Sequence, residues 1–172
     1  MAAVFKYVLP VEETHWKFQG ASETAFTWNY DTSSEELLRL YSKGKQQQWD
    51  AEKRIDWSLD VDPDDPMQIA EEMMPLHGTP LYDKLSARQR SDLRYHSQVH
   101  NLSQFLHGEQ GALVCAARIV QDVPMLESKF YAATQVIDEA RHVEAYRRLL
   151  KEKFRFVYPI APLLQRLLEQ AL

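Results

Sequence analysis

The sequence predicts an all-α protein built on one long antiparallel helix hairpin. Two observations lead to this prediction. Apolar residues recur at helical spacing over residues 86–121 and again over residues 124–154. The break between the two segments, Asp122-Val-Pro124, is so short that the two helices should lie side by side and antiparallel.

The composition fits one domain and excludes several classes of partner. The chain has 172 residues, 45% of them hydrophobic, which suits a single domain over residues 1–172. A net charge of −5 without a block of like charges argues against nucleic acid, because phosphate binding needs clustered lysine and arginine. No stretch approaches the run of about 20 apolar residues that a membrane span needs, so we expect no membrane partner. The single cysteine, Cys115, fits a reducing compartment, and we expect the cytoplasm.

The first part of the chain, residues 1–34, is irregular but too aromatic for a disordered tail. We therefore expect it to form a strap packed over the core. Its large aromatic residues are Trp16, Phe18, Phe26, Trp28 and Tyr30.

An additional helix and a linker should occupy residues 35–85. Ser33 or Ser34 is the expected N-cap, and the helix should run to about Ile55. The acidic stretch 60–66 then ends it. Its aspartate spacing resembles a calcium loop, but the required glycine is missing and two prolines stiffen the segment, so an acidic turn is the simpler interpretation.

The helix hairpin should occupy residues 86–154. Asp122 is available as the N-cap of its second helix, and Pro124 is tolerated in a first turn. Residues 155–172 form a C-terminal segment, in which two prolines precede a short helix over residues 163–172.

Three side chains on the hairpin form a candidate site. Glu109 lies on the apolar stripe of the first helix, and a buried carboxylate without a partner is costly. Glu139 and His142 stand one turn apart on the second helix, so they point an oxygen and a nitrogen into one volume. Gly108 and Gly111 flank Glu109, although each costs about 1 kcal/mol relative to alanine inside a helix. Close helix approach or room for a ligand would explain these two glycines.

Counting from the turn places these side chains at one level. Glu109 lies 14 residues before Val123 and Glu139 lies 16 after it, so at about 1.5 Å per residue their heights differ by about 3 Å. Two carboxylates and an imidazole can share a metal, and they suit iron or manganese better than a thiolate-binding metal. Asp138 is a candidate acceptor for the free N–H of a metal-bound His142.

Other interpretations of the ionisable groups stay open. Glu109 could pair with Arg118 or Arg141 in a buried polar cluster without a metal. His96 and His100, four residues apart, could hold a metal, but a solvated helix face is the simpler interpretation because no carboxylate shares their face.

Longer motifs around these residues resemble a known family. The runs Ser103-Gln-Phe-Leu-His-Gly-Glu-Gln-Gly-Ala-Leu113 and Phe130-Tyr-Ala-Ala-Thr-Gln-Val-Ile-Asp-Glu-Ala-Arg-His-Val143 resemble the ferritin-like di-iron carboxylate proteins. The resemblance is to the N-terminal half of the ribonucleotide-reductase-R2-like branch that includes the aryl-amine N-oxygenases. Upstream, Phe26-Thr-Trp-Asn-Tyr-Asp31, Gln48-Trp-Asp50 and Asp56-Trp-Ser-Leu-Asp-Val-Asp-Pro63 also resemble that branch, so the resemblance covers nearly the whole chain.

The resemblance implies a ferritin-like helical bundle, of which this chain forms a half-bundle built on the helix hairpin. It also implies a non-haem di-iron centre that activates dioxygen to oxidise a small organic substrate, such as an amine. Glu109 would match the single glutamate of one bundle helix, and Glu139 with His142 the first Glu-x-x-His pair. Proteins of this kind use a second half with another glutamate helix and another Glu-x-x-His helix, which this sequence lacks. A homodimer or a complementary second-half subunit would complete the iron site. The alternative is a non-catalytic scaffold or hetero-subunit that has lost the full ligand set, so whether the chain is an enzyme stays open.

Overall fold

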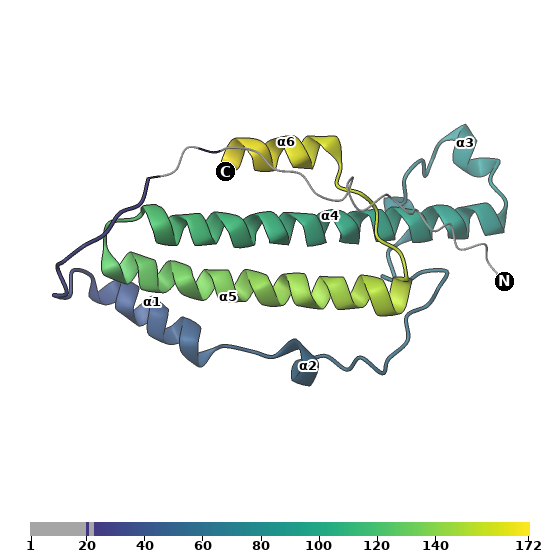
Figure 1. The fold of residues 1–172 in the computed structure, drawn as a ribbon. Coiled ribbons are helices and arrows are strands. Elements are labelled where there is room, and N and C mark those ends of the chain that lie inside the picture. Colours follow the sequence, from purple (N-terminus) through teal and green to yellow (C-terminus); the bar gives the residue numbers. More distant parts are fainter. Residues whose placement is uncertain (1–19, 21–22) are drawn as a thin grey trace.

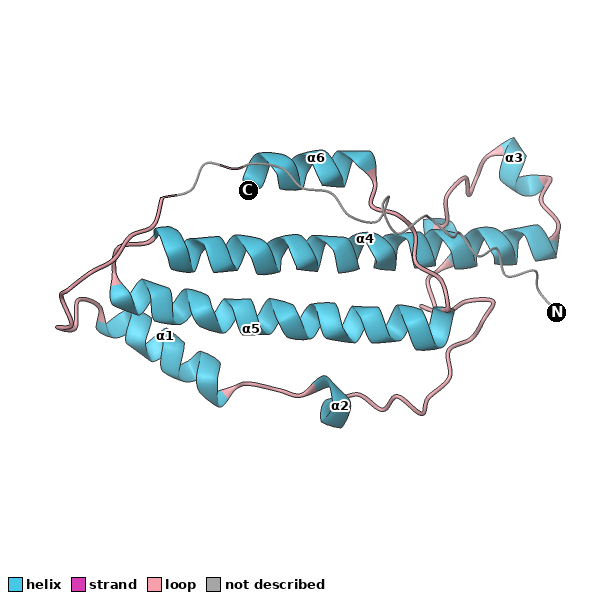
Figure 2. Ribbon diagram, viewed as in Figure 1, coloured by secondary structure: helices cyan, strands magenta, loops and turns pink. Residues whose placement is uncertain are grey.

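The computed structural model describes Gly20 and residues 23–172, and every regular element within these residues is a helix (Figure 2). The two longest helices, α4 (Ala87–Asp122) and α5 (Leu126–Leu149), lie antiparallel and side by side (Figure 1). Helix α1 (Glu35–Gln46) packs along the outer side of α5, and α6 (Pro162–Ala171) packs along α4. The predicted all-α fold with a long helix pair is confirmed.

Helix α4 begins and ends as its sequence suggests. Ser86 and Gln89 form a capping box, in which each side chain accepts a hydrogen bond from the other residue's backbone N–H. The helix then continues without interruption to Asp122. Glu109 lies 13 residues before the end of this 36-residue helix, well inside the part that packs against α5.

The predicted start of α5 is wrong in detail. Asp122 does not cap this helix; its carboxylate lies 3.6 Å from Arg118 at the end of α4. Met125 occupies the N-cap position without a side-chain hydrogen bond, and Pro124 precedes the helix rather than entering its first turn. Proline disfavours a helical conformation in the residue before it, which explains why Val123 is extended.

The best-packed apolar cluster lies at the end of the hairpin away from this turn. Val99 and Leu102 of α4 are buried against Leu150 and Phe154 of a π-helical turn, η3 (Leu150–Phe154), that continues α5. The Tyr95 hydroxyl donates a hydrogen bond of 2.6 Å to the carbonyl oxygen of Phe154 and so closes the end of the turn. This cluster fixes the register of α4 against α5, on which the candidate site depends.

The predicted continuous helix to about Ile55 is also wrong. Helix α1, capped by Ser34, ends at Gln46, and a short α2 (Ala51–Arg54) begins after four non-helical residues. The Asp50 side chain accepts a hydrogen bond of 2.9 Å from the backbone N–H of Glu52. An aspartate that caps the following turn competes with helix continuation, and here the cap prevails.

The described part of the aromatic strap does not pack over the core as expected. Phe26, Trp28 and Tyr30 are 84%, 90% and 74% exposed, while Trp16 and Phe18 lie outside the described residues. Backbone contacts hold the segment instead. Ala25 N–H donates to the carbonyl oxygen of Gln121, and Ser33 N–H donates to the buried carboxylate of Glu127 at 2.6 Å. The strap crosses the end of the hairpin, where helix ends offer polar groups rather than an apolar face.

The acidic linker before α4 uses its carboxylates within the chain, as an acidic turn would. Asp65 accepts a hydrogen bond from the Gln98 amide at 2.9 Å and lies 3.8 Å from Arg94. Beyond it, a 3-10 turn, η2 (Glu71–Met73), and helix α3 (Pro80–Asp83) lead into α4. Glu71 accepts from the Tyr82 hydroxyl at 2.9 Å.

The C-terminal segment returns along α4, and polar side chains of α4 contact it. The Tyr158 hydroxyl lies 2.8 Å from Nδ1 of His96, so the expected solvated face is wrong for His96. The Ser103 hydroxyl, which is fully buried, accepts a hydrogen bond from the backbone N–H of Tyr158. His107 Nε2 lies 2.9 Å from the carbonyl oxygen of Tyr158. These contacts place α6 beside the candidate site.

Within the part of the chain that the structure describes, no helix combines the length and apolarity that crossing a bilayer requires.

Candidate metal centre

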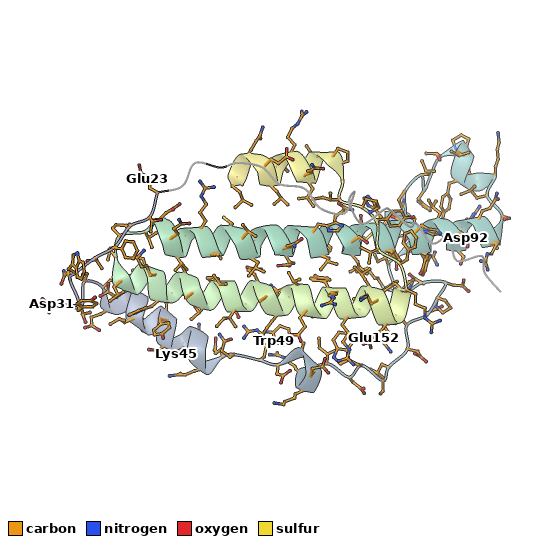
Figure 3. All side chains as sticks on the ribbon, viewed as in Figure 1. Glu23, Asp31, Lys45, Trp49, Asp92 and Glu152 are labelled. Carbon is orange, nitrogen blue, oxygen red and sulfur yellow. The ribbon has the colours of Figure 1, made fainter. Side chains whose placement is uncertain are left out.

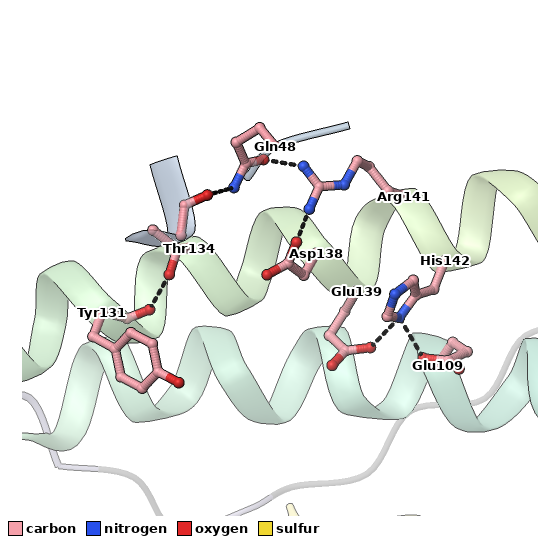
Figure 4. Close-up of polar contacts among 9 residues, drawn as sticks. Gln48, Glu109, Tyr131, Thr134, Asp138, Glu139, Arg141 and His142 are labelled. Atoms are coloured by element: carbon pink, nitrogen blue, oxygen red, sulfur yellow. Dashed lines mark hydrogen bonds and ion pairs between the residues drawn. The ribbon is translucent and has the colours of Figure 1, made fainter. Parts of the chain in front are cut away.

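Glu109 on α4 meets Glu139 and His142 on α5 at the middle of the hairpin. The Nδ1 atom of His142 lies 3.2 Å from Oε2 of Glu109 and 3.2 Å from Oε2 of Glu139 (Figure 4). One ligand atom from each of the three residues lies within 4.8 Å of the others. The structure therefore brings together the three side chains that the sequence singles out.

The local sequence explains why these side chains converge. Glu139 and His142 are three residues apart, so they share a face of α5, and the short turn after Asp122 sets the height of α4 against α5. The side chains of Glu109 and Glu139 are 26% and 21% exposed, and that of His142 is 40% exposed. The group is thus half-buried and open on one side.

The electrostatics of the group favour a cation. Burial and the neighbouring Glu109 carboxyl raise the pKa of Glu139, an effect that the nearby imidazole of His142 opposes. Two carboxylates that crowd one another hold a proton or bind a positive ion. A divalent cation placed between them would relieve the same repulsion.

The alternative, a metal-free cluster in which an arginine pairs with Glu109, has no such pair among the described residues. Arg118 pairs with Asp122, and Arg141 pairs with Asp138 and contacts the Gln48 side chain. No ion pair joins either arginine to Glu109 among the described residues.

Asp138 lies beside the site but is not brought to the imidazole. Its carboxylate pairs with the guanidinium of Arg141, one turn along α5 (Figure 4). Residue 138 is rotated by about 100° from residue 139 around the helix, which directs it toward α1. Its expected role as acceptor for His142 therefore has no contact to support it here.

Sequence reasoning missed the side chain that does lie against His142. The ring centres of Trp49 and His142 are 6.4 Å apart, and Trp49 comes from the break between α1 and α2. The signal that could have located it is Asp50, because an aspartate N-cap at that position predicts a helix end just before it.

A cavity of about 480 Å³ opens beside the two carboxylates, between α4, α5 and α6. Gly108, Glu109, Glu139 and Leu164 line it. A Cβ atom at Gly108 would meet nothing within 4 Å, whereas one at Gly111 would overlap the side chain of Leu168. Gly111 thus permits the close approach of α6, and Gly108 leaves room beside Glu109.

Comparison with known proteins agrees with this arrangement. The family model described as P-aminobenzoate N-oxygenase AurF matches residues 30–171. No curated protein and no solved structure matches the chain. The matched range contains the hairpin, α1, α6 and all three converging side chains.

Proposed function

Since the chain belongs to the p-aminobenzoate N-oxygenase family, a di-iron ferritin-like family, we propose that Glu109, Glu139 and His142 hold iron in an oxygenase of aromatic amines. The substrate would be a small aryl amine, and dioxygen the oxidant. The observation that supports this most is the convergence of the three ligand atoms within 4.8 Å on a half-buried face.

The donor set fits iron in kind. Carboxylate oxygen and imidazole nitrogen are typical ligands of non-haem iron, and manganese takes the same donors. The crowding that raises the pKa of Glu139 is the repulsion that a bound cation relieves. A di-iron bundle site uses four glutamates and two histidines, so Glu109, Glu139 and His142 amount to half of that set.

A second ligand set is therefore part of the proposal. A second copy of the chain, related by a two-fold axis, would bring an identical Glu109, Glu139 and His142 to the open side of the site. A complementary subunit with a glutamate helix and a Glu-x-x-His helix would do the same. Phe105 is 54% exposed and lines the cavity beside Glu109, as expected for a face that another segment covers.

When bound, a di-iron centre supplies the redox chemistry that couples dioxygen to oxidation of the amine. The residues of this chain would hold and orient the reactants. Glu109 from α4 and Glu139 with His142 from α5 would hold the metal between the two helices. The cavity at Gly108 leaves space for a small apolar molecule next to the carboxylates, and Leu164 of α6 closes its far wall.

A non-catalytic scaffold or hetero-subunit is the second candidate. The half set of ligands is the observation that favours it, because three donors leave a di-metal site incomplete. The two candidates differ in one measurable property, which is whether the assembled protein holds iron.

The test is the iron content of wild-type protein and two variants after anaerobic loading with Fe²⁺. Glu139→Gln should abolish stoichiometric iron, because it removes a charged ligand without changing the size of the side chain. Glu144→Gln is the matched control, since Glu144 lies on the exposed side of the same helix. Iron that is unchanged in Glu139→Gln, or lost equally in both variants, would contradict the assignment.

A further inference from the structure

The break between α1 and α2 carries two side chains to α5. Residues 47–50 contain neither glycine nor proline, yet the helix stops there. The Gln48 amide donates a hydrogen bond of 2.9 Å to the carbonyl oxygen of Gly44, and its side-chain oxygen contacts the guanidinium of Arg141 (Figure 4). Trp49 lies on the linker below α5 (Figure 3).

Trp49 packs against both Arg141 and His142, which are neighbours in the sequence of α5. The guanidinium carbon of Arg141 lies 5.4 Å from the centre of the Trp49 ring, within the range of a cation–π contact. Arg54 of α2 lies 5.8 Å from the same ring. The Trp49 and His142 rings are tilted by 35° with centres 6.4 Å apart. Two arginines thus hold an indole ring beside the imidazole.

The orientation of this imidazole decides whether it can serve the site. His142 points Nδ1 at both carboxylates, and its side chain is 40% exposed, so solvent alone would leave it free to rotate. Metal-binding histidines are held by neighbours that fix the plane of the ring, and removal of such a neighbour weakens metal binding. Asp138, about one turn before His142, pairs with Arg141 instead.

We propose that Trp49 is a positioning residue of the metal centre, whose indole ring keeps His142 Nδ1 directed at Glu109 and Glu139. The break between α1 and α2 places it there, and Arg141 with Gln48 anchors the linker. The consequence for metal binding rests on the proposed function, whereas the orientation of the ring does not.

Trp57 offers a matched control on the same linker. Its ring packs on Arg148, with the guanidinium carbon 4.5 Å from the ring centre, and its indole N–H donates to the carbonyl oxygen of Ala51. Trp57 therefore ties the linker to α5 as Trp49 does, but through an arginine seven residues further along the helix. Loss of either tryptophan weakens the linker, and only loss of Trp49 should disturb His142.

The first readout is Co²⁺ binding, measured by titration and by the visible absorption that reports the ligands of the ion. Trp49→Ala should weaken Co²⁺ binding by about tenfold and alter the absorption bands. Trp57→Ala should leave both unchanged, and Trp49→Phe, which keeps an aromatic ring, should restore most of the affinity. Equal effects of the two alanine variants, or no effect of Trp49→Ala, would overturn the proposal.

The second readout needs no metal. In the NMR spectrum of the metal-free protein, the nuclear Overhauser contacts between the His142 ring and the Glu109 side chain should be lost in Trp49→Ala and kept in Trp57→Ala. A wild-type protein that binds no Co²⁺ would contradict the proposed function, and this spectrum would still decide the role of Trp49. Unchanged contacts between His142 and Glu109 in Trp49→Ala would overturn that role.

Discussion

The Nδ1 atom of His142 lies 3.2 Å from the Oε2 atom of Glu109, although the two residues are 33 positions apart and belong to different helices. Glu139 completes the group from the same face of α5 as His142. The alignment depends on the short turn at Val123–Met125 and on the apolar cluster at the far end of the hairpin. The relative positions of the three candidate ligands therefore depend on how α4 packs against α5.

The Glu139 carboxyl should destabilise the metal-free protein. Because folding raises its pKa, the folded protein holds the proton more tightly than the unfolded chain does. Its contribution to stability is therefore most favourable at low pH and falls as the pH rises from the ordinary glutamate range through the raised pKa. Glu139→Gln should unfold at a higher temperature than wild type at neutral pH, measured without metal by circular dichroism. A lower melting temperature at neutral pH would contradict this prediction.

The two glycines beside Glu109 should respond oppositely to alanine. Gly111→Ala places a methyl group against Leu168 of α6, and overpacking of this kind costs about 1–3 kcal/mol. Gly108→Ala meets no neighbour and should gain up to about 1 kcal/mol of helix stability. Urea unfolding of both variants measures the difference. Leu168→Ala added to Gly111→Ala should recover part of the loss, and additive losses would show that the contact is not the cause.

Glu127 should make the attachment of the strap depend on pH. The backbone N–H of Ser33 lowers the pKa of this carboxyl below its ordinary value. A lowered folded-state pKa contributes stability at neutral pH that is lost as the pH falls through the ordinary range to the lowered pKa. Glu127→Ala should therefore be less stable than wild type at pH 7, and the difference should shrink in acid. Glu23→Ala, an exposed glutamate of the same segment, is the control and should change little at either pH.

The hairpin and its three converging side chains could be predicted because the signals are local and repeated. Apolar periodicity over residues 86–121 fixes the face that carries Glu109, and three-residue spacing fixes the pair on α5. Counting from the turn then sets the height. These three inferences do not depend on which segments pack on the outside of the hairpin.

The Trp49 contact and the exposed strap were not predicted, because they depend on single residues and on what packs outside the hairpin. A single capping residue, Asp50, ends the helix that propensity would continue, and one residue is a weak signal against a favourable run. The aromatic residues of the strap indicate burial, but composition does not say which surface covers them. Phe26 and Trp28 find no such surface within the described part of this chain.

Native mass spectrometry of the purified chain, loaded with Fe²⁺ without oxygen, tests the metal centre most directly, because one spectrum gives both the number of chains and the number of metal ions. We predict a dimer carrying two iron ions, with both ions lost in Glu139→Gln and kept in Glu144→Gln. A wild-type protein that stays free of iron, as monomer or dimer, would contradict the assignment of Glu109, Glu139 and His142 as ligands of a centre completed by a second copy.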